Sequence, residues 1–178
     1  MHFYINKVGK TLAKTPQFAK LMVESRTKWE KVGESVFIGE YRHSLDAKNR
    51  MIVPSKFREQ LGDTFVVTRW LDGCLTIYKE SQWIALTEKL ETIPMTNKAG
   101  RDFIRMLMSK AVECSVDNQG RIQLSQALLD AADIDKKVCV IGASNHVEIW
   151  SEEKWDAYNE ENAESFTEEA ESLTEFLR

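Results

Sequence analysis

The sequence predicts a single α+β domain, a small β-barrel built from two similar units in tandem with flanking helices. Three observations point to this fold. The pattern Ser-x-Asp-x-x-x-Arg occurs at residues 44–50 and again at 115–121. Short runs of alternating apolar and polar residues surround both copies, and segments with helical spacing follow them. Because one unit has too few strands to bury both faces of its sheet, we expect the units to share one core.

The similarity between the units extends well beyond the motif. At an offset of 71 positions, residues 44–57 align with 115–128. After one inserted residue the offset becomes 72, and residues 66–83 align with 138–155. A match that keeps its order over this length indicates an internal duplication.

Each unit is expected to open with a strand that leads into a tight turn. An Asp starts the turn, where its side chain can accept hydrogen bonds from the backbone amides ahead of it. The fourth turn position is Asn49 in one unit and Gly120 in the other, and these residue types best tolerate a positive φ. We predict strands at 37–41 and 111–114 and turns at 46–49 and 117–120.

The remaining elements follow the same order in both units. After the turn come a short strand, a short helix, a hairpin and a closing helix. The first unit, residues 36–93, is predicted to hold them at 50–53, 55–61, 64–79 and 80–93. The second unit, residues 110–165, is predicted to hold them at 121–124, 125–132, 136–150 and 152–165. A helix within 99–111 joins the units, and the whole domain spans 36–165.

The net charge of −4 conceals an uneven distribution. Residues 1–35 carry seven Lys or Arg against three Asp or Glu, whereas residues 151–178 carry two against ten. The acidic balance therefore belongs to the C-terminal end, where residues 166–178 are expected to form an acidic tail. Residues 42–58 hold five cations against one acid. Such a cluster suits contact with nucleic acid, although scattered surface Lys and Arg would look the same.

Several other classes of protein are disfavoured. No apolar run reaches the roughly 18–20 residues of a membrane helix. Cys74, Cys114 and Cys139 are odd in number and never in C-x-x-C spacing, which argues against a disulfide framework or zinc site and fits a reducing cytoplasm. The histidines form no metalloprotease or triad-like pattern, and no Gly-rich phosphate-binding motif occurs. We therefore expect no enzyme, no cofactor and no metal.

The segments FIGEYRHSLDAKNRMIVPSKFREQL and ECSVDNQGRIQLSQALL resemble the MraZ family of bacterial transcriptional regulators. The resemblance covers residues 36–165, and the two Asp-x-x-x-Arg motifs are its most specific mark. It implies an AbrB/MazE-like swapped-hairpin barrel, a ring of several copies, and binding to short repeated boxes in promoter DNA. It also implies repression of the division and cell-wall gene cluster by a protein located in the cytoplasm at the nucleoid, with no membrane partner.

Five basic residues are the expected DNA contacts: Arg42, Lys48, Arg50, Arg58 and Arg121. Arg50 is expected to read a base, because arginine can pair bidentately with guanine in the major groove. Lys48 is expected to position the DNA backbone, and Arg42 and Arg58 to add phosphate contacts. Arg121 is expected to contribute more weakly, since the second unit departs from the family's basic pattern. Gln119, Ser125 and Leu129 stand where the first unit has Lys48, Pro54 and Arg58.

A structural role is expected for four turn residues, Asp46, Asn49, Asp117 and Gly120. An acid that faced phosphate would repel it, so each Asp is expected to bind the arginine of its own turn. The aromatic residues are expected in the core or at a contact between copies: Trp70, Tyr78, Trp83, Trp150 and Trp155.

Two alternatives stay open at this point. The first is an antitoxin-like or purely assembling interaction protein of the same fold, although an antitoxin usually has one such motif and this chain has two. The second concerns residues 1–35, an N-terminal extension that is either an upstream leader or a genuine helix with apolar residues at helical spacing from Phe18 to Val32.

Overall fold

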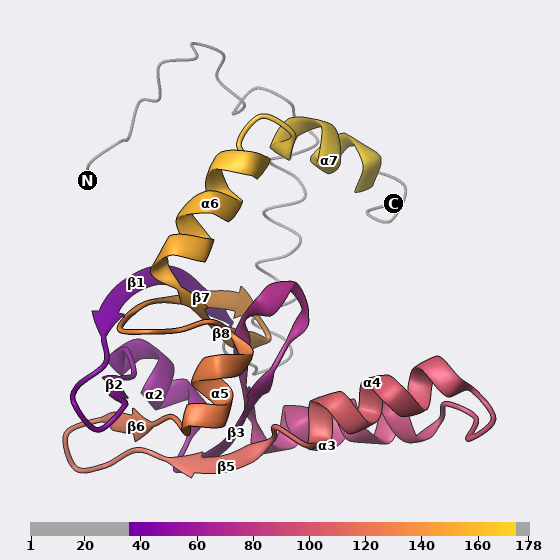
Figure 1. Cartoon of the computed structure of the whole chain (residues 1–178), viewed down its shortest axis with the longest axis horizontal. Coiled ribbons are helices and arrows are strands. Elements are labelled where there is room, and N and C mark those ends of the chain that lie inside the picture. Colours follow the sequence, from indigo (N-terminus) through magenta and orange to yellow (C-terminus); the bar gives the residue numbers. More distant parts are fainter. Residues whose placement is uncertain (1–35, 174–178) are drawn as a thin grey trace. The chain divides into compact units, whose positions relative to one another are not determined.

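The helices and strands follow one another in the order that the sequence predicts (Figure 1). The structure, a computed structural model, describes residues 36–173. The alternatives for residues 1–35 therefore lie outside the described residues. The first unit contains β1 (Phe37–Ser44), β2 (Arg50–Ile52), α2 (Ser55–Leu61), β3 (Thr64–Arg69), the 3₁₀ turn η2 (Leu71–Gly73), β4 (Leu75–Lys79) and α3 (Glu80–Glu91).

The second unit repeats this order after the connecting helix α4 (Lys98–Met108). It contains β5 (Val112–Ser115), β6 (Arg121–Gln123), α5 (Gln126–Ala131), β7 (Lys137–Ser144), β8 (His146–Ser151) and α6 (Glu152–Asn162). Part of the expected acidic tail is helical, as α7 (Phe166–Ser172). None of the helices in the described part of the chain is long and apolar enough to cross a membrane.

Most strand pairs join one unit to the other. In the antiparallel six-stranded sheet, β1 pairs with β7, β4 with β8 and β3 with β5. The short strands β2 and β6 pair with each other and form a separate ribbon. The hairpins β3–β4 and β7–β8 pair within their own units. The units therefore share their sheets, and the expected α+β class is confirmed.

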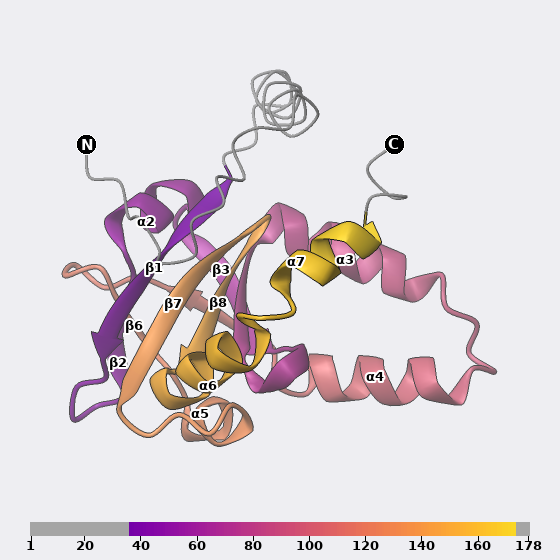
Figure 2. The same ribbon diagram turned by 90° about the horizontal axis from the view of Figure 1, so that it is seen from above.

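The six-stranded sheet is open, so the expected closed barrel is wrong. Its strand order is β1-β7-β8-β4-β3-β5, which places β1 and β5 at opposite edges. All eight residues of β1 pair with β7, and the four residues of β5 pair with β3. Figure 2 shows β1, β7 and β8 running side by side. The short strands β2 and β6 follow the edge strands β1 and β5 in the chain but pair only with each other, so the described residues show no ladder that joins the two edges.

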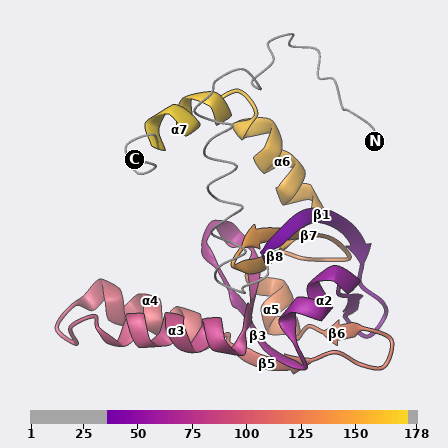
Figure 3. The ribbon, with the colours of Figure 1, turned by 180° about the vertical axis from the view of Figure 1, so that it is seen from behind.

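One apolar core joins the sheet, the ribbon and the two short helices. At aligned positions, α2 buries Phe57 and α5 buries Leu128. The Phe57 ring packs edge-to-face on Phe37, with centroids 5.6 Å apart, and on Tyr41, with centroids 5.2 Å apart. Both helices lie below β1 and β7 in Figures 1 and 3, whereas α6 lies above these strands. The two short helices thus pack their buried residues into the core on the same side of the sheet.

Unlike residues start the two short helices. Pro54 precedes α2 with φ −51°, the value that its ring imposes and a helix start accepts. Ser125 precedes α5, and its side chain accepts a hydrogen bond of 3.3 Å from the backbone N–H of Leu128. The substitution of Pro by Ser between the units therefore changes the capping chemistry and leaves the helix in place.

The aromatic residues form two clusters where helices α3 and α6 follow the sheet. Tyr78 is buried, and its ring lies 5.7 Å from Trp70 and 6.3 Å from Trp83 between centroids. Trp150 is buried beside Trp155, with centroids 5.5 Å apart. Core packing therefore accounts for Tyr78 and Trp150, and the other three rings are half-buried around them.

Candidate nucleic-acid interface

The ribbon of β2 and β6 carries one arginine from each unit. Its register places Arg50 opposite Gln123, Met51 opposite Ile122, and Ile52 opposite Arg121. Neighbouring residues of a strand point to opposite faces, and the central pair is buried in the core. The outer face of the ribbon is formed by the remaining residues, Arg50, Ile52, Arg121 and Gln123.

Asp46 fastens the first turn to the ribbon. Its Oδ1 accepts hydrogen bonds from the backbone N–H of Lys48 at 2.8 Å and of Arg50 at 3.0 Å. Its Oδ2 accepts from the Arg50 guanidinium, at 2.8 Å from Nε and 2.6 Å from Nη2. The turn is closed by the backbone N–H of Asn49, which donates to the carbonyl of Asp46 while Asn49 adopts φ 58°.

Asp117 makes the same set of contacts in the second turn. Its Oδ1 accepts from the backbone N–H of Gln119 at 2.9 Å and of Arg121 at 3.0 Å. Its Oδ2 accepts from Nε and Nη2 of Arg121 at 2.9 and 2.7 Å. Gly120 takes the positive φ that Asn49 takes in the first turn, here 73°. Both arginines are therefore held in fixed orientation by an aspartate four residues earlier.

Both aspartates stay ionised far below neutral pH. A hydrogen bond from Arg50 lowers the pKa of Asp46 from its ordinary value of 3.8 to about 2. A hydrogen bond from Arg121 lowers the pKa of Asp117 to about 2 in the same way. Each turn is thus fastened by a full negative charge at physiological pH.

The two turns also meet each other across the ribbon. Nη1 of Arg121 lies 3.8 Å from Oδ2 of Asp46. The hydrogen bond to Asp46 is the main cause that raises the pKa of Arg50, and the charge of Asp117 adds to it. The four charges form one neutral cluster. Because Asp46 engages Nε and Nη2 of Arg50, this guanidinium offers Nη1 to an outside acceptor; Nη1 has no hydrogen bond to the residues that the structure describes.

Lys48 and Arg58 give each turn one further cation. Lys48 is exposed in the first turn and forms no ion pair within residues 36–173. The equivalent residue of the second turn is the uncharged Gln119. Arg58 of α2 contacts that turn instead. Its guanidinium occupies the place that a Cβ on residue 120 would take, and the glycine leaves this place open. The second turn therefore receives its cation from the first unit.

Backbone and side-chain hydrogen bonds tie each turn to the opposite unit. Val53 donates its backbone N–H to the carbonyl of Gly120 at 3.0 Å, and Leu124 donates to the carbonyl of Asn49 at 2.9 Å. The side chain of Asn49 donates to Oε1 of Gln126 at 3.3 Å. Each turn is therefore hydrogen-bonded to the opposite unit.

Arg42 lies away from the turns, on β1 beside α6. Its guanidinium donates to both carboxylate oxygens of Asp156, at 2.7 Å from Nη2 and 3.2 Å from Nη1, and to Glu40 at 3.1 Å. These acids raise the pKa of Arg42 above its ordinary value, the hydrogen bond to Asp156 most of all. The structure thus brings together four of the five expected DNA contacts and separates Arg42 from them.

Sequence reasoning missed Ile52 and Gln123 as members of this surface. The alternation of apolar and polar residues in the two short strands could have indicated them. Met51 and Ile122 are the apolar central residues of these strands and point to the core, so their neighbours point outward. What the sequence could not supply was the pairing of β2 with β6. That pairing places both residues on one face with both arginines.

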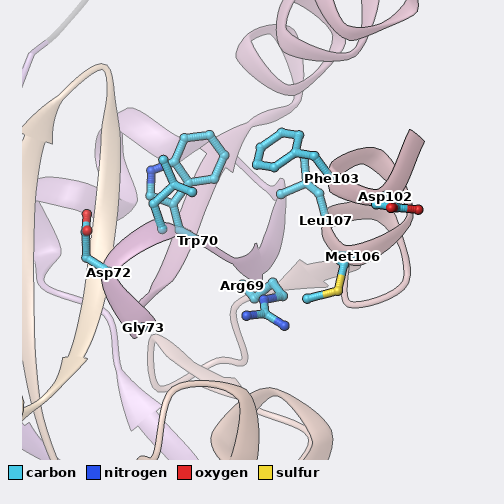
Figure 4. Close-up of a pocket in the computed structure, with 9 residues that line it drawn as sticks. Arg69, Trp70, Asp72, Gly73, Asp102, Phe103, Met106 and Leu107 are labelled. Atoms are coloured by element: carbon cyan, nitrogen blue, oxygen red, sulfur yellow. The ribbon is translucent and has the colours of Figure 1, made fainter. Parts of the chain in front are cut away.

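A separate hollow of about 380 Å³ lies between the end of β3 and α4. Figure 4 shows Trp70 and Phe103 near one another at its wall, with Met106 and Leu107 projecting from α4. Its lining includes a basic residue, Arg69, and an acidic residue, Asp102, so the hollow is neither clearly basic nor clearly acidic. Among the described residues, no group of three or more His, Cys, Asp or Glu could hold a metal ion.

Comparison with known proteins gives consistent results. The family described as "MraZ protein, putative antitoxin-like" matches the chain twice, at residues 36–106 and 107–177. The Transcriptional regulator MraZ of Ligilactobacillus salivarius is 50% identical over 141 residues, which cover 79% of this chain and 99% of the relative. The protein of the same name from Clostridium acetobutylicum is 51% identical over 129 residues, which cover 72% of this chain and 91% of the relative.

A third relative of that name, from Desulforamulus reducens, is 46% identical over 142 residues, which cover 80% of this chain and all of the relative. The two family matches divide the chain within α4, between the two halves of the duplication. The repeated turns and the shared ribbon lie inside the matched residues. The chain therefore belongs to the MraZ family of transcriptional regulators.

Proposed function

We propose that this protein binds double-stranded promoter DNA in a sequence-specific manner through the outer face of the ribbon. The observation that carries the proposal is the pair of matched turns on one ribbon, each presenting an arginine held by its own aspartate. A two-stranded β-ribbon fits the major groove of B-DNA, and arginine there pairs with guanine. Holding the guanidinium in place before binding reduces the entropy cost of the contact.

The expected contacts differ in their roles. Arg50 and Arg121 approach bases, each through the part of the guanidinium that its aspartate leaves free. Lys48 and Arg58 bind phosphates on either side, one at each turn. Arg42 contributes least, because Asp156 already binds its guanidinium. The four-charge cluster is neutral, so attraction to the DNA backbone rests mainly on Lys48 and Arg58.

A single copy with so few free cations would bind DNA weakly. We therefore propose that several copies assemble into a ring and bind short repeated promoter boxes together. Once one copy is bound, the next contact is intramolecular and gains from a high effective concentration. Within this proposal the protein represses the division and cell-wall gene cluster, and the strand exchange between the units is the swapped-hairpin arrangement of the AbrB/MazE-like fold.

A binding titration tests the proposal. The protein and Arg50→Ala are titrated with DNA from upstream of the chain's own gene and with a scrambled duplex, at two salt concentrations. We expect the natural DNA to bind tighter than the scrambled duplex, and Arg50→Ala to lose about five- to a hundredfold in affinity for it. Circular dichroism of the variant checks that the fold is kept. Wild-type affinity in a folded Arg50→Ala protein would contradict the role of Arg50.

An interaction protein without DNA readout is the second candidate. The hollow between β3 and α4 favours it, because Met106 is 51% exposed there beside the half-buried Trp70 and Phe103. Equal affinity for the natural and scrambled duplexes, or no binding to either, would favour this candidate over the DNA-binding regulator.

A further inference from the structure

The ribbon has an approximate twofold symmetry that its side chains break at one pair of positions. Its register centres on Met51 opposite Ile122, so a twofold axis through this pair exchanges Arg50 with Arg121. The same axis exchanges Ile52 with Gln123. The arginines match, whereas an apolar residue and an amide stand at the other two positions. On the outer face, the two arginines are therefore related by the twofold axis, whereas the residues opposite them, Ile52 and Gln123, differ in chemistry.

The exposure of Ile52 is not explained by the core. Met51 is fully buried and Ile122 is 1% exposed, whereas Ile52 is 48% exposed. Single exposed apolar residues are common on proteins. Ile52 differs from an ordinary case in its surroundings, because it lies directly opposite Arg121 on a face whose other members are polar.

The two side chains suit different base pairs. In the major groove, an apolar side chain packs on the C5-methyl group of thymine, and a glutamine can pair bidentately with N6 and N7 of adenine. Arg121 lies opposite Ile52, and Arg50 lies opposite Gln123. Each cross-strand pair thus combines a guanine-reading group with a group suited to an A·T pair, but the latter differs in kind between the two pairs.

We propose that Ile52 and Gln123 are specificity-determining contacts and that their difference gives the DNA box a direction. Ile52 packs on a thymine methyl beside the base pair that Arg121 reads, and Gln123 reads an adenine beside the base pair that Arg50 reads. The inference rests on the proposed DNA binding at the same ribbon. With identical residues at both positions the face would favour a palindromic box. The Ile and Gln side chains make it favour a box that reads differently in the two directions.

The repeat supplies its own reciprocal variants for the test. Wild type, Ile52→Gln, Gln123→Ile and the double exchange each select duplexes from a pool that is randomised in sequence, and the selected boxes are sequenced. We expect Ile52→Gln and Gln123→Ile to select boxes closer to palindromes and to bind the wild-type box about tenfold more weakly. The double exchange should select the same box as wild type but bind it in the opposite orientation, with the positions of Arg50 and Arg121 on the DNA exchanged. A cleavage reagent attached beside one turn detects this orientation, because it cuts the DNA at the end of the box that this turn contacts.

Val112→Gln serves as the matched control, because Val112 is an exposed strand residue at 41% exposure and lies outside the ribbon, on β5. It should select the wild-type box. If all the exchange variants also select the wild-type box while Arg50→Ala loses binding, the DNA-binding proposal stands and this inference is overturned. If Ile52→Gln changes the mass of the assembly and leaves the box unchanged, Ile52 contacts another copy and the inference is likewise overturned. If wild type enriches no sequence, the proposed function itself fails.

Discussion

The two turns share one backbone and differ in the chemistry that surrounds it. The aspartate and arginine of each turn make the same contacts with nearly the same distances. The third and fourth positions differ, being Lys48 and Asn49 in one turn and Gln119 and Gly120 in the other. Both turns therefore keep the Asp-x-x-x-Arg contacts, while the third position changes its charge and the fourth changes only between residue types that tolerate a positive φ.

The divergence is compensated across the units. Gly120 leaves room for the guanidinium of Arg58, which brings to the second turn the cation that Gln119 does not provide. Arg58 has no counterpart in the second unit, because Leu129 occupies the aligned position and is buried. Each turn thus has a second cation beside its arginine, although both of these additional cations, Lys48 and Arg58, belong to the first unit.

The largest expected effect tests whether the two units are one folding unit. Phe57 and Leu128 are aligned, and both are 1% exposed. Phe57→Ala should lower the free energy of unfolding by about 3–5 kcal/mol and Leu128→Ala by about 2–5 kcal/mol. Denaturant unfolding followed by circular dichroism measures both values. Each variant should unfold in a single transition, because the core is shared, and two separate transitions would contradict a common core.

The next effect compares the cations of the two turns. Lys48→Ala and Arg58→Ala should each weaken binding to all DNA sequences by a similar factor. Each should also reduce the slope of log affinity against log salt by about 1, since each removes one of the proposed phosphate contacts. Titrations over a salt series measure both quantities. Arg42→Ala is the control, and its slope should stay near that of wild type because Asp156 binds this arginine.

A smaller effect should follow from exchanging the fourth turn residue. Gly120→Asn keeps a residue that tolerates positive φ, but its side chain would occupy the place of the Arg58 guanidinium. We expect nearly wild-type thermal stability together with weaker DNA binding, close to that of Arg58→Ala. The matched exchange Asn49→Gly should leave DNA affinity almost unchanged. Equal losses in both variants would show that the turn backbone, and not the position of Arg58, limits binding.

The smallest effect concerns acid stability. The pKa values of Asp46 and Asp117 are lowered to about 2 in the folded chain, below the ordinary value of 3.8. These carboxylates therefore stabilise the fold above about pH 4, and this stabilisation is lost as the pH falls from 4 through 2. Asp46→Asn or Asp117→Asn should flatten thermal stability in that window and lower it modestly at pH 7. An unchanged acid profile in both variants would contradict the ionic fastening of the turns.

Much of the local structure could be predicted from the sequence, because the duplication repeats each signal. The turns, the short helices and both hairpins lie within a few residues of the predicted positions. Asn49 and Gly120 have the positive φ that their residue types suggested. The predicted closed barrel was wrong, because alternation marks a strand without saying which strand it pairs with.

Some contacts of the candidate site could be predicted from the sequence and others could not. The Asp-x-x-x-Arg spacing suggests contacts between residues four apart, which the chain makes within each turn. The position of Arg58 over the second turn, the pairing of Arg42 with Asp156, and the membership of Ile52 and Gln123 in the outer face all join residues that are distant in the sequence. No local pattern reports such contacts.

By itself, the sequence of this protein determined the duplicated elements, the two turns and the family, since these depend on short-range chemistry written twice. The tertiary structure alone decided that the sheet stays open, that one unit lends a cation to the other, and that the two arginines share a face with Ile52 and Gln123. The physical reason is that strand pairing and packing between the units depend on how much apolar surface the whole chain buries. No single segment of the sequence contains that information.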